Sequence, residues 1–299
     1  MKNIPVTHIF YKTDAPPELQ AVFLREYAAN GVKYIVLTDT MINRIMANIQ
    51  DRFFYKDLAG DTGLVFADAH APFGKFVDLN CPIAELRKEK ILRARLAMEI
   101  AADFGINTIT FHVGSPRHPG FTMEELHTEA LRTIEELLPY AEECGLTFCI
   151  ENIWYPTATA DKLLDIKNHF PTDTLGFCFD SGHANIAECK EYLLREDSAI
   201  AQAYALVGLP AKTEENTLEK MLPHIVNCHL HDNSGFRDEH KIPGHGTIDW
   251  KKIISTLSRA PRLKCIQNET LEPFYPPVTP GTSIRKMVET FDSILKTVQ

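Results

Sequence analysis

The stretch TFCIENIWYPTATADKLLDIKNHFPTDTLGFCFDSGH, residues 147–183, shows the pattern that decides the fold prediction. Two short apolar runs, Thr147–Glu151 and Leu175–Asp180, enclose a segment with helical periodicity, Ala160–His169. Short β-branched and aromatic runs are typical of strands, and a helix between two of them lets the strands pair in parallel. The stretch therefore predicts a strand, a crossover helix and a second, parallel strand.

The same unit recurs along the whole chain. The predicted strands are Thr7–Tyr11, Tyr34–Thr38, Leu64–His70, Thr108–His112, Thr147–Glu151, Leu175–Asp180, Ile225–His229 and Lys264–Glu269. The predicted helices are Pro17–Asn30, Ile83–Phe104, Met123–Cys144, Ala160–His169, Leu218–Pro223, Trp250–Ser258 and Ser283–Val298. Eight such units predict an α/β fold of the (β/α)8 TIM barrel type.

No linker-like or low-complexity segment divides the chain, so residues 1–299 are expected to form a single TIM-barrel domain. The run from Glu188 to Glu219 is longer than one connection needs and predicts an additional helix there.

The composition limits the cellular environments and the kinds of partner that we expect for this chain. The chain has 44% hydrophobic and 24% charged residues, no apolar run long enough to span a membrane, and no apolar signal-peptide core near its N-terminus. Its seven cysteines form no CxxC pair, which favours reduced thiols and a cytoplasmic location. A formal charge of −9 gives no general attraction for nucleic acid. Glycine-rich nucleotide-binding motifs and GxSxG are absent, so no nucleotide cofactor or serine nucleophile is predicted.

Ionisable side chains stand at the carboxyl ends of the predicted strands from the third onward. They are His70, His112, Glu151, Asp180 with His183 in the turn DSGH, His229 and Glu269. Burying such groups costs free energy unless they are paired or bind an ion, and in a parallel barrel all strand carboxyl ends meet on one face. The oxygen and nitrogen donors suit Mn²⁺, Mg²⁺, Co²⁺ or Zn²⁺. The sequence therefore predicts a divalent metal site on that face.

The loop after the seventh strand, HLHDNSGFRDEH at residues 229–240, opens on the same predicted face and adds Asp238 and His240. A solvated polar loop is the alternative interpretation, and for His70 and His112 a structural hydrogen-bonding role stays open. Candidate substrate contacts beside the strand ends are Lys75, Arg117 and Arg237 for a phosphate or hydroxyl group, and Phe73, Trp154 and Phe236 for an apolar wall. Ordinary surface or packing roles are the alternative for these six residues.

The motifs HAPF, FHVGS, FCIENIW, GFCFDSGH, VNCHLHDN and CIQNET, from about His70 to Glu269, together resemble the xylose isomerase-like barrel superfamily. This superfamily contains sugar and sugar-phosphate isomerases and epimerases and the endonuclease IV family of abasic-site nucleases. The resemblance to its ketose epimerases implies one divalent ion held by Glu151, Asp180, His229 and Glu269. It also implies that Glu151 and Glu269 are the acid and base, and that His183 contacts the substrate.

We accordingly expect a divalent-metal-dependent isomerase or epimerase of a small sugar or sugar phosphate, acting by proton transfer through an enediolate. His183, His112, His70 and Arg237 are expected to bind the substrate. The resemblance further implies assembly into a homo-oligomer. The identity of the sugar and of the metal is left open.

Two alternatives remain at this point. Endonuclease IV-like enzymes hold three zinc ions with nine ligands, and additional metal ligands matching that pattern are His70, His112, His183, Asp238 and His240. That resemblance implies a zinc phosphodiesterase acting on abasic DNA. The acidic chain and the few basic residues in MINRIMANIQDR and HAPFGKFVDLN argue against it. The second alternative is a catalytically inactive barrel that only binds a ligand.

Overall fold

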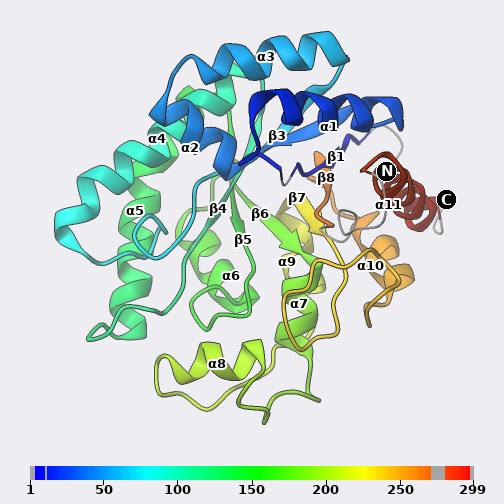
Figure 1. Cartoon of the computed structure of the whole chain (residues 1–299). Helices are drawn as coiled ribbons and strands as arrows, with labels where there is room; N and C mark the ends of the chain where they lie inside the picture. The colour runs from blue at the N-terminus through cyan, green and yellow to red at the C-terminus, as the bar shows by residue number, and fades with distance from the viewer. Residues whose placement is uncertain (1–3, 11, 271–279, 297–299) are drawn as a thin grey trace.

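Eight parallel strands close into a barrel in the computed structural model, which describes residues 4–10, 12–270 and 280–296. Each strand pairs with the next in sequence, and β8 returns to pair with β1 (Figure 1). The strands are β1 Val6–His8, β2 Tyr34–Leu37, β3 Val65–His70, β4 Thr108–His112, β5 Thr147–Glu151, β6 Leu175–Asp180, β7 Ile225–Leu230 and β8 Cys265–Asn268. The predicted (β/α)8 barrel is confirmed. Tyr11, the last residue of the first predicted strand, lies outside the described residues.

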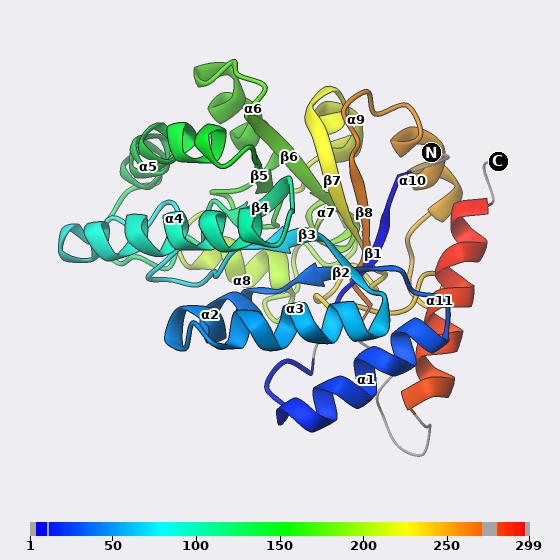
Figure 2. The same ribbon diagram turned by 90° about the horizontal axis from the view of Figure 1, so that it is seen from above.

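Helices surround the strands, as Figures 1 and 2 show. They are α1 Pro17–Ala29, α2 Asp39–Ala47, α3 Asp51–Thr62, α4 Arg87–Asp103, α5 Met123–Glu143, α6 Ala160–His169, α7 Ser181–Glu188, α8 Ala199–Ala205, α9 Thr217–Met221, α10 Trp250–Leu257 and α11 Pro280–Lys296, with 3-10 turns at Ala84–Leu86 and Leu222–His224. The additional helix predicted between Glu188 and Glu219 is confirmed by α8. Val298, the end of the last predicted helix, lies outside the described residues. No described helix combines the length and apolar composition that crossing a bilayer requires.

Helices α2 and α3 are absent from the helices predicted from sequence. Asn48 ends α2 with an extended backbone, φ −144° and ψ 103°, so the apolar residues of 39–62 do not follow one continuous helical period. Thr38 caps the start of α2, and its side chain accepts a hydrogen bond from the Met41 N–H. Two short helices with a break between them explain why periodicity missed this segment.

The strands separate two layers of side chains. Phe148 and Ile150 of β5 belong to the large apolar core shared with the helices, whereas Cys149 packs with Cys178 in a small separate cluster. Because successive side chains of a strand point to opposite faces, Glu151 lies on the same face as Cys149, at the carboxyl end of the barrel interior. The strand cysteines Cys149, Cys178, Cys228 and Cys265 are buried free thiols.

Replacing Phe148 with alanine is expected to lower the free energy of unfolding by about 3–5 kcal/mol, because it leaves a cavity in the strand–helix core. Phe148 is fully buried and stacks on Phe111, with ring centroids 4.2 Å apart. Urea denaturation measures the change. Phe53→Ala is the matched control, since Phe53 is 46% exposed and its loss should change stability by under about 0.5 kcal/mol. Equal losses in the two variants would contradict the assignment of the core.

Candidate metal centre

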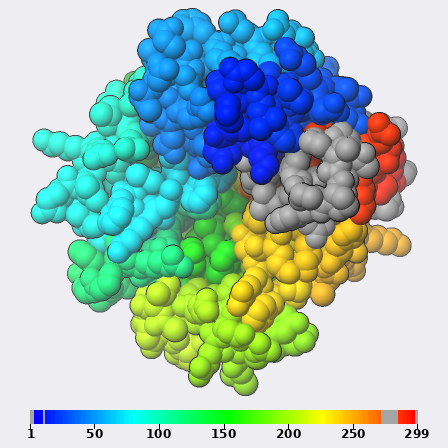
Figure 3. Space-filling model, viewed as in Figure 1, coloured from blue at the N-terminus to red at the C-terminus, as the bar shows by residue number. Residues whose placement is uncertain are grey.

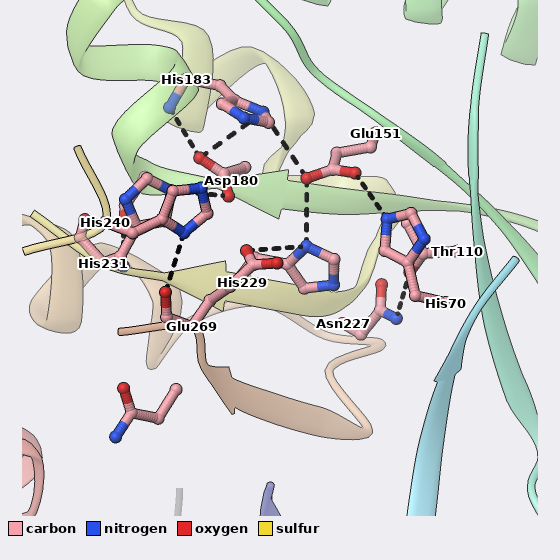
Figure 4. Close-up of polar contacts among 12 residues, drawn as sticks. His70, Thr110, Glu151, Asp180, His183, Asn227, His229, His231, His240 and Glu269 are labelled. Atoms are coloured by element: carbon pink, nitrogen blue, oxygen red, sulfur yellow. Dashed lines mark hydrogen bonds and ion pairs between the residues drawn. The ribbon is translucent and has the colours of Figure 1, made fainter. Parts of the chain in front are cut away.

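Four side chains at the carboxyl end of the barrel offer ligand atoms within 4.8 Å of one another: Glu151, Asp180, His229 and Glu269. All four are buried (Figure 4). Strand register brings them together, because β6 pairs with β7 so that Asp180 lies opposite His229. Glu269 follows β8 directly, and its backbone N–H donates to the Leu230 carbonyl of β7. The four residues predicted as the metal ligands therefore form one compact group.

Four imidazoles surround the Glu151 carboxylate. Its Oε1 lies 3.0 Å from Nδ1 of His229 and 3.5 Å from Nδ1 of His183. Its Oε2 lies 3.1 Å from Nε2 of His112 and 3.5 Å from Nε2 of His70. Burial alone would raise the pKa of Glu151, but His229, His112 and His70 outweigh that effect and hold the pKa well below its usual range. Glu151 is therefore a carboxylate in this centre.

Glu269 has the opposite electrostatic environment. Burial raises the pKa of this carboxyl well above its usual range, and the nearby negative charges of Asp180 and Glu151 raise it further. Its Oε2 lies 3.3 Å from Nδ1 of His229, on the side of that ring that also faces Glu151. The pKa values of two neighbouring glutamates are thus shifted in opposite directions. Such a pair of shifts is found where one carboxyl acts as acid and another as base.

Asp180 connects the centre to the start of helix α7. Its Oδ1 accepts a 2.6 Å hydrogen bond from the His183 backbone N–H, which caps the helix, and its Oδ2 lies 3.2 Å from Nε2 of His231. His231 is fully buried, and a Cβ added at Gly182 would collide with its ring. The glycine of the turn DSGH is therefore required by close approach of this ring.

His231 is a site residue that the sequence analysis did not single out. Its ring belongs to two of the groups whose ligand atoms converge, one with Asp180 and His183 and one with His240 and Glu269. Its position directly after β7, two residues beyond His229, is the one sequence signal, and its role follows from the packing of its ring.

Asp238 and His240 reach the same centre from the loop after β7. Asp238 Oδ2 lies 3.0 Å from Nε2 of His240 and 3.6 Å from Nε2 of His183. Burial would raise the pKa of Asp238, but His183 and His240 hold it well below its usual range. The His240 ring stacks on that of His231 at 3.9 Å between centroids, and its Nδ1 lies 2.8 Å from the Glu269 carbonyl oxygen. All nine residues of the two predicted ligand sets are thus brought together.

Asp232 holds the loop that carries Asp238 and His240. Its Oδ1 accepts from the backbone N–H groups of Asn233 and Ile248, and its Oδ2 accepts from Gly244 N–H and from Trp250 Nε1. These donors span the segment from the end of β7 to the start of α10, so one buried carboxylate closes the loop. Asp249 caps that helix, because its side chain accepts a hydrogen bond from the Lys252 N–H.

The donor set fits a divalent cation. Among the described residues, no lysine or arginine forms an ion pair with Glu151, Asp180 or Asp238. Oδ1 of Asp238 is buried without a hydrogen-bond partner in the described part of the chain. Buried carboxylates whose partners carry no permanent positive charge are costly, and an ion bound between them removes that cost. Oxygen and imidazole nitrogen donors are those that Mn²⁺, Mg²⁺, Co²⁺ and Zn²⁺ accept.

A cavity of about 430 Å³ opens above this group, at the hollow in the face shown in Figure 3. Its lining includes His70, His112, Glu151, His183, Asp238, His240 and Glu269, together with Phe73, Lys75, Arg117 and Trp154. Asp180, His229 and His231 lie beneath it and are not part of the lining. Arg237 is exposed and Phe236 half-buried, and neither lines the cavity, so the substrate role of Arg237 stays a prediction.

The chain belongs to the xylose isomerase-like TIM barrel family, whose model matches residues 24–291. An uncharacterized protein of Methanocaldococcus jannaschii is 28% identical over 63% of this chain, and the match spans 58% of that relative's length.

Two solved structures share the fold. The IOLI protein with a binding zinc atom has a TM-score of 0.70 at 18% identity, with coverage of 98% of this chain and 99% of that one. A D-tagatose 3-epimerase-like protein has a TM-score of 0.67 at 20% identity, with 90% of each chain covered.

Replacing Asp232 with asparagine is expected to lower the free energy of unfolding by about 2–3 kcal/mol. The amide has one acceptor oxygen, so its NH2 group would face donors such as Gly244 N–H and Trp250 Nε1 in place of Oδ2. Urea denaturation measures the loss, and limited proteolysis locates it in residues 232–250. Asp249→Asn is the control in the same loop, because asparagine caps a helix as well as aspartate does. Equal stability of Asp232→Asn and wild type would contradict the anchoring role.

Proposed function

We propose that this protein is a divalent-metal-dependent isomerase or epimerase of a small keto sugar. The observation that carries the proposal is that only two of the four candidate metal ligands line the cavity. Glu151 and Glu269 line the cavity, whereas Asp180 and His229 lie beneath it. Two carboxylates therefore reach a bound substrate, and the other two residues complete the ion's donor set from below. The names of the D-tagatose 3-epimerase-like protein and the zinc-binding IOLI protein support this reading.

The chemistry follows from those positions. A divalent cation held by Glu151, Asp180, His229 and Glu269 would supply a Lewis acid that stabilises negative charge on the substrate oxygens. One glutamate removes the proton from the carbon beside the ketone, and the bonding electrons move toward the carbonyl oxygen to give an enediolate. The other glutamate returns a proton to carbon. Return to the same carbon from the opposite side inverts it, and return to the neighbouring carbon moves the carbonyl group.

The cavity wall suits a hydroxylated substrate. Imidazoles of His70, His112, His183 and His240 face the space above the carboxylates and can donate or accept hydrogen bonds. Phe73 and Trp154 add apolar surface. Clefts of this size that combine aromatic walls with a few convergent polar groups are typical of small-molecule sites.

Glu151→Gln and Glu269→Gln are each expected to slow exchange of the substrate's carbon-bound hydrogen with deuterium from D2O by about 100-fold or more, because each removes one proton-transfer group. Proton NMR of a panel of ketohexoses and ketopentoses with the Mn²⁺-loaded protein measures the exchange. Glu124→Gln, at an exposed position on α5, is the control. Full exchange by Glu151→Gln on a substrate of the wild type would overturn the proposal.

A second candidate function is a zinc phosphodiesterase acting on abasic DNA. We call Glu151, Asp180, His229 and Glu269 the inner four residues. The observation that favours this second function is that five further residues contact one of these four or one another: His70, His112, His183, Asp238 and His240. Such a set offers enough donors for more than one ion. A single-ion epimerase needs only the inner four as ligands, and the other five then serve as the wall that binds the substrate.

Metal stoichiometry separates the two functions. We expect elemental analysis of protein purified without chelator to give about one divalent ion per chain. Among the described residues, Glu151, Asp180, His229 and Glu269 form the group of converging ligand atoms that contains both glutamates. The same preparation is assayed for deuterium exchange on ketoses and for incision of a duplex with one abasic site. Three zinc ions with incision would replace the proposed function by the second one. Sugar binding without exchange or incision would instead indicate a barrel that only binds its ligand.

A further inference from the structure

The connection after β6 adds a wall that the barrel itself does not need. Helix α8 lies in this connection, apart from the ring of helices around the strands (Figure 1). It has its own small apolar cluster, formed by Ile186, Ile200, Ala203 and Tyr204. Trp154 and Tyr155, from the loop after β5, pack against the same cluster. We call the segment between α7 and α9, residues 189–216, the insertion. It covers the rim of the site beside Trp154.

The insertion is also tied to the loop that carries Asp238. The backbone N–H of Ala199 donates to the Phe236 carbonyl at 3.0 Å, and the rings of Tyr192 and Phe236 meet edge to face at 5.2 Å. Ser198 is fully buried and caps α8 through the Ala201 N–H. These contacts fix the position of α8 relative to the metal centre. The space beside α8 therefore has a defined shape.

A second cavity, of about 500 Å³, lies along α8 and is called the α8 cavity below. Its lining includes Glu196, Gln202 and Leu206 from the insertion and Arg117, Trp154 and Tyr155 from the barrel loops. The last three residues also line the cavity above the metal centre. The two cavities are therefore neighbours, with these three residues between them.

The lining indicates the chemistry of an occupant. Trp154, Tyr155 and Leu206 provide apolar surface, and Gln202, Arg117 and Glu196 provide hydrogen-bond donors and acceptors. One guanidinium and one carboxylate give no net charge that would select a phosphate group. A neutral ring with hydroxyl groups on its edge and C–H groups on its faces matches this mixture.

We propose that the α8 cavity is a subsite for a second sugar ring, so that the substrate is a ketose carrying another sugar through a glycosidic bond. This inference rests on the proposed function, because it assumes that the ketose itself lies over the metal centre. The bond to the second ring remains intact, and only the carbon-bound proton of the ketose moves. Arg117, Trp154 and Tyr155 then contact the substrate where its two rings join.

The test compares free fructose with two disaccharides that contain it, isomaltulose and lactulose, in the Mn²⁺-loaded full-length protein. Solvent-deuterium exchange gives kcat/KM for each sugar, and isothermal titration calorimetry gives its Kd. In the wild type, at least one disaccharide is expected to exceed fructose about tenfold in kcat/KM and to bind more tightly. Ala205 is an exposed residue of α8 that lines the cavity, so Ala205→Trp fills the subsite from the solvent side. This variant is expected to lower the disaccharide-to-fructose ratio by about tenfold.

Ala201→Trp is the matched control, since Ala201 lies on the same helix but does not line the α8 cavity, and it should leave that ratio unchanged. The inference is overturned if neither disaccharide exceeds fructose in binding and Ala205→Trp leaves the ratio of the two Kd values unchanged. Calorimetry tests the subsite through binding alone, whereas deuterium exchange tests the proposed function. A protein that shows no exchange on any ketose therefore contradicts the proposed function without deciding the subsite.

Discussion

The burial of three carboxylates in one small volume is the constraint on which the rest of this site depends. Glu151, Asp180 and Glu269 are buried and bring ligand atoms within 4.8 Å of one another and of His229. Like charges at such distances repel strongly in a medium of low polarity. In the described part of the chain, the ion-pair partners of Glu151 and Asp180 are imidazoles and include no lysine or arginine. An imidazole can carry a proton or be neutral beside an ion, so this environment suits a bound cation whose charge replaces those protons.

Because these groups repel one another, the surrounding structure must hold their side chains in place. Asp180 has a second task as the cap of α7, so moving it would cost the helix its first hydrogen bond. His231 presses against Gly182, where no other residue fits, and stacks on His240. His240 itself has a positive φ of 47°, an uncommon conformation for a residue with a side chain. The contacts of its ring and the anchoring of the loop by Asp232 hold it there.

Much of this was predictable from sequence, for definite reasons. Parallel strands buried on both faces give continuous apolar runs, so a Glu or Asp at the end of such a run, as at Glu151 and Asp180, stands out. The role of His231 was not predictable in the same way, because it depends on the packing of its ring between Gly182 and His240. The break at Asn48 hid α2 and α3, and the exposure of Arg237 depends on a turn whose direction no local pattern specifies. The α8 cavity arises between segments far apart in sequence.

The nine residues gathered at the carboxyl end of the barrel could serve either proton transfer on a sugar or hydrolysis of a phosphodiester, so their surroundings bear on which function we propose. A nucleic-acid duplex brings a row of phosphates, and affinity for it comes from many basic side chains along a groove. In the described part of the chain, the basic residues that line the main cavity are Lys75 and Arg117. The aromatic rings of Phe73, Trp154 and Tyr155 line the same cavity. Two basic side chains offer little of that attraction, which is consistent with the small-molecule substrate that we propose.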